Sequence, residues 1–116
     1  MASSTKGQHL IIEFTNCNKQ KIHNLEILDD FFSQEILKYD LIILQKSSHK
    51  FQPHGVTMLY LLSESHLSIH TWPEYRYLAF DLYSCGKSDI EPLANDICNF
   101  LECDIHKKLL LNRGLT

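Results

Sequence analysis

The chain contains 116 residues, 44% of them hydrophobic and 10% aromatic, which is enough apolar material for the core of one compact domain. Its net charge of -3 provides no basic stripe to neutralise nucleic-acid phosphates, and its longest apolar runs fall far short of the ~20 residues of a membrane-spanning helix. We therefore expect a soluble, cytoplasmic protein with no nucleic-acid or membrane partner.

Small and polar residues without periodicity occupy positions 1–8, where we expect a mobile arm, and a single domain is expected over residues 9–116. His9–Thr15 is rich in β-branched and aromatic residues, which predicts a first strand, and the polar segment Asn16–Gln20 predicts a turn. Apolar residues then recur at spacings of three and four between Asn24 and Tyr39, which predicts an amphipathic helix.

Two further strands are predicted at Asp40–Gln45 and Val56–Leu62. They are separated by the polar stretch Lys46–Lys50 and by Pro53-His54-Gly55, whose residue types are typical of turns. No linker long enough to divide the chain into domains occurs between these elements.

A hairpin is predicted from Leu67–Trp72 and Tyr77–Ser84, because the connection Pro73–Arg76 has four residues, an ordinary hairpin length. A regular antiparallel register would pair Trp72 with Tyr77, His70 with Ala79, Ser68 with Asp81, His66 with Tyr83, and Glu64 with Cys85. This register brings Cys85 beside the peptide bond between Glu64 and Ser65.

After Gly86, the segment Ser88–Glu91 has the form of a capping box and predicts the start of a second helix, which carries Leu93, Ile97, Phe100 and Leu101. Asp104–Asn112 predicts a last strand. The order of the elements favours the α+β class, as a two-layer sandwich in which both helices pack on one face of a mostly antiparallel sheet.

Four cysteines and seven histidines raise the questions of disulfides and metal binding. The cysteines show no C-x-x-C spacing, so reduced thiols are the simpler interpretation. His66 and His70 have the spacing of a helical ligand pair, but their surroundings predict a strand, on which four residues span ~13 Å. One ion cannot bridge that distance, and we expect no metal.

Reactive side chains are concentrated between Ser63 and Glu74, followed by Cys85. Strand alternation gives two opposed groups, the first being His66, Ser68, His70 and Trp72, and the second Leu67, Ile69 and Thr71. An exposed polar hairpin would explain these residues without any chemistry. A Cys–His hydrolase would need an oxyanion hole as well, and the sequence has no nucleophile-elbow glycine pattern.

Three segments, Phe51–Val56, Ser63–Tyr75 and Asp81–Gly86, resemble the bacterial and archaeal type of S-adenosylmethionine decarboxylase, and His9–Phe14 fits as well. The resemblance covers most of the chain. Its core is Glu-Ser-His-Leu-Ser-Ile-His-Thr-Trp-Pro-Glu-Tyr with Cys-Gly eleven residues beyond Glu74, which is too long and chemically unusual to arise by chance.

The resemblance implies that the chain cuts itself between Glu64 and Ser65, into residues 1–64 and 65–116. Ser65 would become a covalent pyruvoyl group that forms a Schiff base with the substrate, so that no external cofactor is needed.

Further roles follow from the same resemblance. His70 would be the base that removes the Ser65 α-proton during processing, and Cys85 the proton donor during decarboxylation. Thr57 stands where the family commonly has a serine; it keeps the hydroxyl that helps the acyl shift but adds a methyl group. The remaining cysteines match no family role: Cys17, Cys98 and Cys103.

The substrate-binding residues implied by the resemblance are aromatic and acidic. Phe51 and Trp72 would stack on an adenine, and Glu74 would accept hydrogen bonds from ribose hydroxyls. In the simpler alternatives, Phe51 and Trp72 are core aromatics and Glu74 is a solvated carboxylate. Arg76 stands where the family usually has a glycine, which adds a cation beside this loop.

The family roles of Ser65 and His70 do not transfer directly to this sequence. The two residues lie five positions apart, and strict strand alternation points their side chains to opposite faces. We therefore expect the cleavage junction to lie in a turn or bulge if the two residues meet. Thr57 lies eight residues before Ser65, and a straight strand would hold it ~26 Å away.

The resemblance implies a homodimer with active sites near the interface that decarboxylates S-adenosylmethionine for spermidine biosynthesis. The four residues Glu64, Ser65, His70 and Cys85 would serve any amino-acid substrate, so a pyruvoyl-dependent arginine or ornithine decarboxylase is the first alternative. The second is a regulatory homologue that never cleaves.

Overall fold

A computed structural model describes residues 5–115, and six strands in it form one sheet. They are β1 (Gly7–Thr15), β2 (Ile43–Lys50), β3 (Val56–Leu62), β4 (Ser65–Trp72), β5 (Tyr77–Ser84) and β6 (Asp104–Arg113). Their order across the sheet is β2-β3-β4-β5-β1-β6, and every neighbouring pair is antiparallel.

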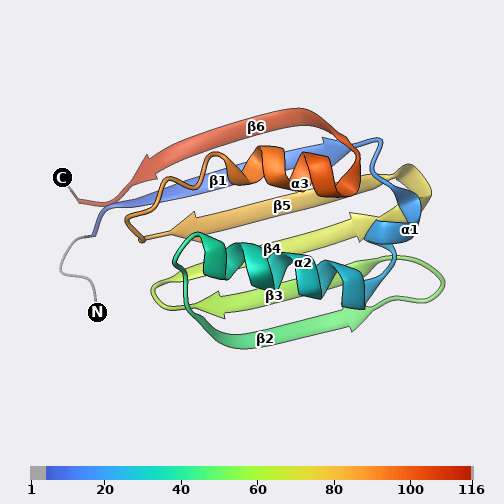
Figure 1. Cartoon of the computed structure of the whole chain (residues 1–116), viewed down its shortest axis with the longest axis horizontal. Coiled ribbons are helices and arrows are strands. Elements are labelled where there is room, and N and C mark those ends of the chain that lie inside the picture. Colours follow the sequence, from blue (N-terminus) through green and yellow to red (C-terminus); the bar gives the residue numbers. More distant parts are fainter. Residues whose placement is uncertain (1–4, 116) are drawn as a thin grey trace.

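The helices are α1 (Lys19–Ile22), α2 (Leu25–Lys38) and α3 (Leu93–Leu101), with a 3-10 turn, η1 (Pro73–Tyr75), in the β4–β5 hairpin. Figure 1 shows α2 and α3 side by side across the same face of the sheet. The predicted two-layer α+β sandwich is therefore confirmed. None of the described helices is long and apolar enough to cross a membrane.

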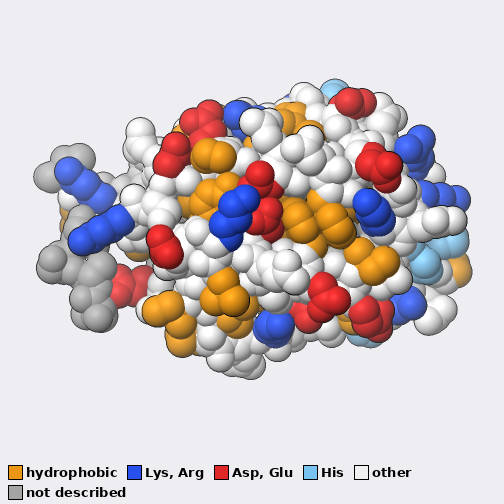
Figure 2. Space-filling view, in the orientation of Figure 1, with side chains coloured by type: hydrophobic (Ala, Val, Ile, Leu, Met, Phe, Trp, Pro, Cys, Tyr) orange, Lys and Arg blue, Asp and Glu red, His pale blue; other side chains and the backbone are white. Residues whose placement is uncertain are grey.

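The core lies between this sheet face and the helices, because alternate strand residues point toward the apolar stripes of α2 and α3. Its fully or almost fully buried side chains include Leu10, Phe14, Phe32, Phe80 and Ile97. Burying a side chain of this size stabilises the fold by about 1.5–3 kcal/mol. On the outer surface of the helix layer, acidic and basic side chains are interspersed among apolar ones (Figure 2).

Two helix starts differ in how well the sequence predicts them. Helix α2 begins as expected, with the Asn24 side chain accepting a hydrogen bond from the Ile27 backbone N–H at 3.0 Å. The predicted capping box is wrong, because α3 begins only after Pro92, without a side-chain cap. Asp89 instead accepts a hydrogen bond from the Glu91 N–H, which closes a turn ahead of the helix.

Strand β2 also differs from prediction, since it runs from Ile43 to Lys50 instead of from Asp40 to Gln45. The polar stretch predicted as a loop, Lys46–Lys50, is most of this strand. β2 lies at the edge of the sheet and is almost wholly exposed, so its side chains need not be apolar, and lysines protect such an edge from pairing with other chains.

The amino-terminal region differs in smaller ways. β1 begins at Gly7, two residues before the predicted start, so the proposed arm over residues 1–8 includes the first two residues of a strand. Residues 1–4 of that arm lie outside the described part of the chain. The predicted turn Asn16–Gln20 contains the start of α1, whose four residues are too few for a periodic signal.

The register of the central hairpin is as predicted for four pairs, namely Trp72 with Tyr77, His70 with Ala79, Ser68 with Asp81, and His66 with Tyr83. The fifth predicted pair, Glu64 with Cys85, is absent from this ladder. Leu62 pairs with Ser65 across β3 and β4, which leaves Ser63 and Glu64 as a two-residue loop.

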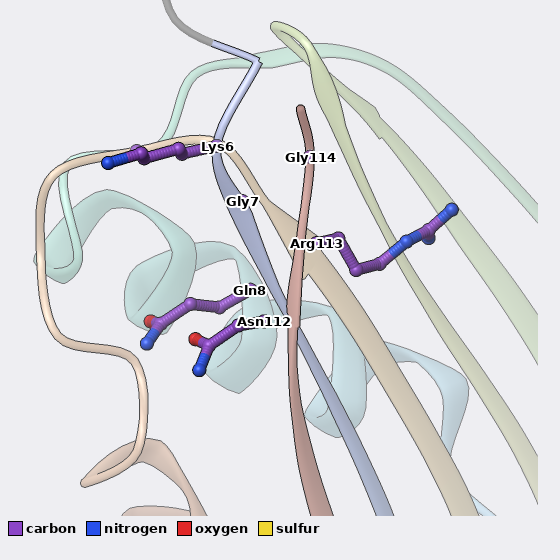
Figure 3. A pocket seen from close by; sticks show the side chains of 7 residues that line it. Lys6, Gly7, Gln8, Asn112, Arg113 and Gly114 are labelled. Atoms are coloured by element: carbon purple, nitrogen blue, oxygen red, sulfur yellow. The ribbon is translucent and has the colours of Figure 1, made fainter. Parts of the chain in front are cut away.

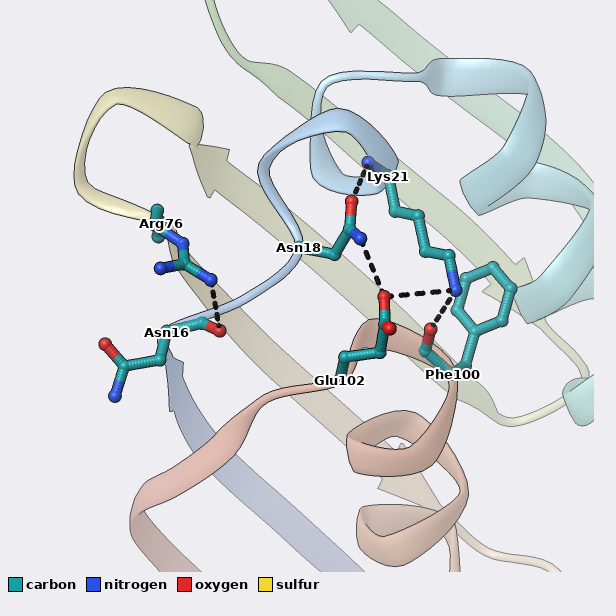
Figure 4. A network of polar contacts seen from close by, with 6 residues as sticks. All are labelled: Asn16, Asn18, Lys21, Arg76, Phe100 and Glu102. Atoms are coloured by element: carbon teal, nitrogen blue, oxygen red, sulfur yellow. Dashed lines mark hydrogen bonds and ion pairs between the residues drawn. The ribbon is translucent and has the colours of Figure 1, made fainter.

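Arg76 lies in the β4–β5 hairpin, but its side chain points away from the substrate-binding loop beside which the sequence predicted a cation. Its Nε donates to the Cys17 carbonyl at 2.9 Å, and its Nη2 donates to the Asn16 carbonyl at 3.1 Å. Figure 4 shows the adjoining network, in which the Asn18 side chain donates to Glu102 at 2.7 Å. Arg76 therefore fixes the end of β1 against the hairpin. Its φ of 53° is left-handed, which is the conformation that favours glycine.

Candidate active site

The peptide bond between Glu64 and Ser65 lies where the two-residue β3–β4 loop meets β4, so the predicted cleavage junction is in a turn. Glu64 has a φ of 60°, a left-handed conformation that costs a residue with a side chain about 1–2 kcal/mol. Ser65 is the first residue of β4 and is only 8% exposed. The backbone N–H of Cys85 donates to Ser65 Oγ at 3.1 Å, which holds the hydroxyl next to the strained peptide.

Cys85 lies at the same end of the sheet, directly after β5. Its thiol donates to the Tyr83 hydroxyl at 3.3 Å. When the sulfur is deprotonated, the phenol becomes the donor in this hydrogen bond, and the bond raises the pKa of Tyr83. Tyr83 belongs to the half-buried residues of β5 that face away from the helices, so the thiol lies toward the open face of the sheet. The structure thus brings together Glu64, Ser65 and Cys85.

A second group of predicted residues surrounds a cavity of about 370 Å³ at the other end of β4. Five predicted residues line it, namely Phe51, Thr57, His70, Trp72 and Glu74. A volume of this size is in the range of small-molecule sites.

Thr57 and His70 are a cross-strand pair, and Thr57 Oγ1 lies 3.0 Å from His70 Nδ1. The hydroxyl therefore belongs with the imidazole and not with Ser65. Gly55 lets the loop before β3 approach β4 closely: its φ is 101°, and a Cβ there would lie 3.0 Å from the Thr71 carbonyl oxygen. The Thr71 hydroxyl completes this contact by accepting from the Val56 N–H at 3.0 Å.

Both predicted adenine-stacking residues are exposed, so neither is a core aromatic. Phe51 is 46% exposed and Trp72 is 41% exposed. Trp72 stacks on Tyr77, with ring centroids 5.1 Å apart, and Phe51 packs edge-on against His49 at 4.5 Å. These contacts orient the rings beside the cavity while leaving aromatic surface open to a ligand.

The two groups of residues do not meet within one chain. β4 is paired regularly along its whole length, and five residues at ~3.3 Å each separate Ser65 from His70 by roughly 16 Å. Their side chains also point to opposite faces, since Ser65 is buried with Leu67 and Ile69. The junction lies in a turn, but the turn does not bring His70 to it.

Three further polar residues, which the sequence did not single out together, meet on the open face from three adjacent strands. Ligand atoms of His9, His66 and Asp81 all lie within 4.8 Å of one another, a grouping that could hold a metal ion. His9 Nδ1, however, lies 3.3 Å from Arg113 Nη1, and a guanidinium can only donate. His9 Nε2 therefore carries the proton and donates to Asp81. A metal ion bound here would have to displace the Arg113 guanidinium from His9 Nδ1 and the proton from His9 Nε2. We therefore interpret Arg113, His9 and Asp81 as a hydrogen-bonded chain.

The three cysteines without a predicted role, Cys17, Cys98 and Cys103, lie together near the carboxyl end of β1. Cys98 and Cys103 have sulfur atoms 3.8 Å apart, and Cys17 is buried beside them. Burial raises the pKa of Cys98 to about 11, and a hydrogen bond with Cys17 raises that of Cys103. Cys98 and Cys103 therefore remain protonated thiols near neutral pH, and both pack against the core that contains Cys17.

Another cavity, of about 390 Å³, lies where β1 begins and β6 ends, next to the loop that contains Gly86. Figure 3 shows the Gln8 and Asn112 side chains pointing into one side of it, whereas Arg113 points to the other side of the strands. This cavity contains none of the predicted site residues.

Comparisons with known proteins agree on one family. Residues 8–114 match the family described as S-adenosylmethionine decarboxylase. The S-adenosylmethionine decarboxylase proenzyme of Bacillus velezensis is 33% identical over 111 residues, which cover 96% of this chain and 88% of that protein.

The proenzyme of the same name from Thermosipho melanesiensis is 42% identical over 86 residues, covering 74% of this chain. That match spans only 65% of the Thermosipho protein, less than two thirds of its length. A crystal structure of the adenosylmethionine decarboxylase from Aquifex aeolicus superposes with a TM-score of 0.86 at 29% identity, covering 98% of this chain and 95% of that one. The chain therefore belongs to the S-adenosylmethionine decarboxylase family.

Proposed function

We propose that this protein is a self-cleaving decarboxylase of S-adenosylmethionine whose reactive carbonyl is made from Ser65. The observation that carries the proposal is the strained loop: Glu64 is left-handed, and the next residue presents a hydroxyl held by the Cys85 N–H. Backbone strain at Glu64 favours rearrangement of the Glu64–Ser65 peptide bond, because breaking that bond releases the strain.

Cleavage needs a nucleophile and a base. Ser65 Oγ attacks the Glu64 carbonyl carbon, and the amide becomes an ester as the Ser65 nitrogen leaves with a proton. The His70 imidazole then removes the Ser65 α-proton, the ester breaks by β-elimination, and Glu64 leaves as a carboxylate. Hydrolysis of the resulting dehydroalanine releases ammonia and leaves a pyruvoyl group.

A pyruvoyl group supplies a carbonyl that condenses with the substrate amine and accepts the electrons released with carbon dioxide. The residues of this chain fit that chemistry. Cleavage detaches Ser65 from Ser63 and Glu64, so the new end of β4 can turn toward the open face, where the Cys85 thiol lies. Cys85 would then protonate the substrate carbon.

The division of the site along β4 supports a homodimer. If two sheets pack face to face about a two-fold axis, so that the β4 strands cross in opposite directions, Ser65 of each chain lies opposite the His70 end of the other. The open face is apolar enough for such packing, since it exposes Leu59, Leu61, Leu109 and Leu111. Each cavity would then be completed by the cleaved end of the other chain.

Substrate choice is tested by measuring carbon dioxide release from carboxyl-labelled S-adenosylmethionine, arginine and ornithine with freshly purified protein. We expect release from S-adenosylmethionine alone, since Phe51 and Trp72 offer aromatic surface for an adenine. The product would be the aminopropyl donor of spermidine biosynthesis. Release from arginine or ornithine alone would contradict the substrate, and an intact chain that releases none would indicate a regulatory homologue.

Replacing Phe51 or Trp72 with alanine is expected to weaken binding of S-adenosylmethionine by about 1–3 kcal/mol, roughly 5- to 150-fold in Kd, if each ring stacks on the base. Calorimetry on a cleaved but catalytically slow Cys85→Ala background measures this directly. Leu37→Ala is the matched control, because Leu37 is 63% exposed on helix α2, remote from the cavity. Unchanged binding in both aromatic variants would contradict their assignment.

A further inference from the structure

Tyr83 is the side-chain partner of the Cys85 thiol. The sulfur lies 3.3 Å from the Tyr83 hydroxyl oxygen, with the thiol donating. Tyr83 is the last residue of β5 before Ser84, and Cys85 directly follows the strand, so both are beside Ser65. Tyr83 has no role in the cleavage or decarboxylation steps described above.

The Tyr83 ring is held from three directions. The Arg113 guanidinium lies over it, 4.7 Å from its centroid, and the His9 and His66 rings lie 5.8 and 5.9 Å away. His9 and His66 are also the backbone pairing partners of Tyr83 on the neighbouring strands. Figure 3 shows Arg113 extending away from Gln8 and Asn112. A ring fixed in this way can fix the position of the thiol.

From this geometry we infer that Tyr83 is a positioning residue for the proton transfer by Cys85, an inference that rests on the proposed function. Before the transfer, the hydroxyl accepts from the thiol and selects one of its rotamers. In the transfer, the S–H bond breaks, a C–H bond forms at the substrate carbon, and the sulfur becomes a thiolate. The hydroxyl then rotates and donates to the thiolate, in a bond stronger than one between neutral groups.

The hydroxyl is able to donate at that stage because it keeps its own proton. The hydrogen bond with Cys85 raises the pKa of Tyr83, so the phenol is neutral at neutral pH. Tyr83→Phe removes this one oxygen and keeps the ring, so the packing under Arg113 and beside the histidines is retained. The variant therefore separates the effect of the hydroxyl from that of the fold.

The test uses the full chain carrying Tyr83→Phe. Self-cleavage should proceed as in the wild type, because the bond to Ser65 Oγ comes from the Cys85 backbone. We expect kcat to fall about tenfold, the loss of one hydrogen bond to a charged group, with KM unchanged. Protonation of the pyruvoyl carbon instead of the substrate carbon, followed by hydrolysis of the imine, leaves the substrate nitrogen on the chain as alanine and releases an aldehyde. This side reaction should become several-fold faster, as measured by the mass of the 65–116 fragment. Tyr75→Phe, at an exposed tyrosine of the hairpin, is the control and should behave as wild type.

A double variant shows whether Tyr83 acts through Cys85. Adding Tyr83→Phe to Cys85→Ala should change neither kcat nor alanine formation further, because the partner is already absent. An active wild type with unchanged kcat and alanine formation in Tyr83→Phe would overturn this inference alone, as would additive losses in the double variant. A wild type that neither cleaves nor releases carbon dioxide would overturn the proposed function as well.

Discussion

Ser65→Ala is expected to yield a single uncut chain with no decarboxylase activity, the largest effect of any single substitution. Alanine removes the only oxygen at this position that can convert the Glu64 amide to an ester. The fold should persist, because the small Ser65 side chain makes one hydrogen bond, to the Cys85 N–H, and lies at the end of a strand. Loss of activity would therefore report the missing nucleophile.

Intact mass under denaturing conditions measures this outcome. Wild-type protein should separate into residues 1–64 and 65–116, with the second fragment blocked to amino-terminal sequencing because its serine has lost the amino nitrogen. Ser63→Ala changes a hydroxyl in the same two-residue loop and is the control, expected to cleave normally. The mechanism is wrong if Ser65→Ala is cut, or if an uncut wild type is fully active.

The register of the β4–β5 hairpin could be predicted from the sequence for four of the five expected pairs, because two strong local signals agree there. Buried and open positions alternate strictly along Ser65–Trp72, and a four-residue connection containing Pro73 leaves only one register that keeps the apolar side chains on one face. Strand β2 lacks both signals. It is an edge strand with water on nearly every side chain, so its sequence reads as a polar loop.

The resemblance named the residues of the candidate site, but the sequence could not give their arrangement. Resemblance named Ser65 and His70 together, whereas the regular pairing of β4 keeps them roughly 16 Å apart in one chain. The chain of Arg113, His9 and Asp81 could not be seen in the sequence, because its members come from β6, β1 and β5 and meet only through strand order. Arg76 was misplaced because side-chain direction in a left-handed turn cannot be inferred from neighbouring residues.

Mixed dimers of two inactive variants are expected to recover self-cleavage, which follows from the division of the site along β4. His70→Ala alone should stall at an ester that hydroxylamine can cut, since the acyl shift can precede loss of the α-proton. When Ser65→Ala and His70→Ala chains are co-expressed, a mixed dimer contains one complete site, built from Ser65 of one chain and His70 of the other.

Statistical mixing makes half of the dimers mixed, so about a quarter of all sites should be complete and activity should reach roughly a quarter of the wild-type value. Only the His70→Ala chain should be cut, which tags of different mass reveal. The matched control is co-expression of Ser65→Ala chains with Cys85→Ala chains. Because Ser65 and Cys85 lie at the same end of one chain, these mixed dimers should show no turnover beyond that of Cys85→Ala. Absence of cutting in verified Ser65→Ala and His70→Ala mixed dimers would show that His70 does not act across a two-fold interface, and the face-to-face dimer would have to be abandoned.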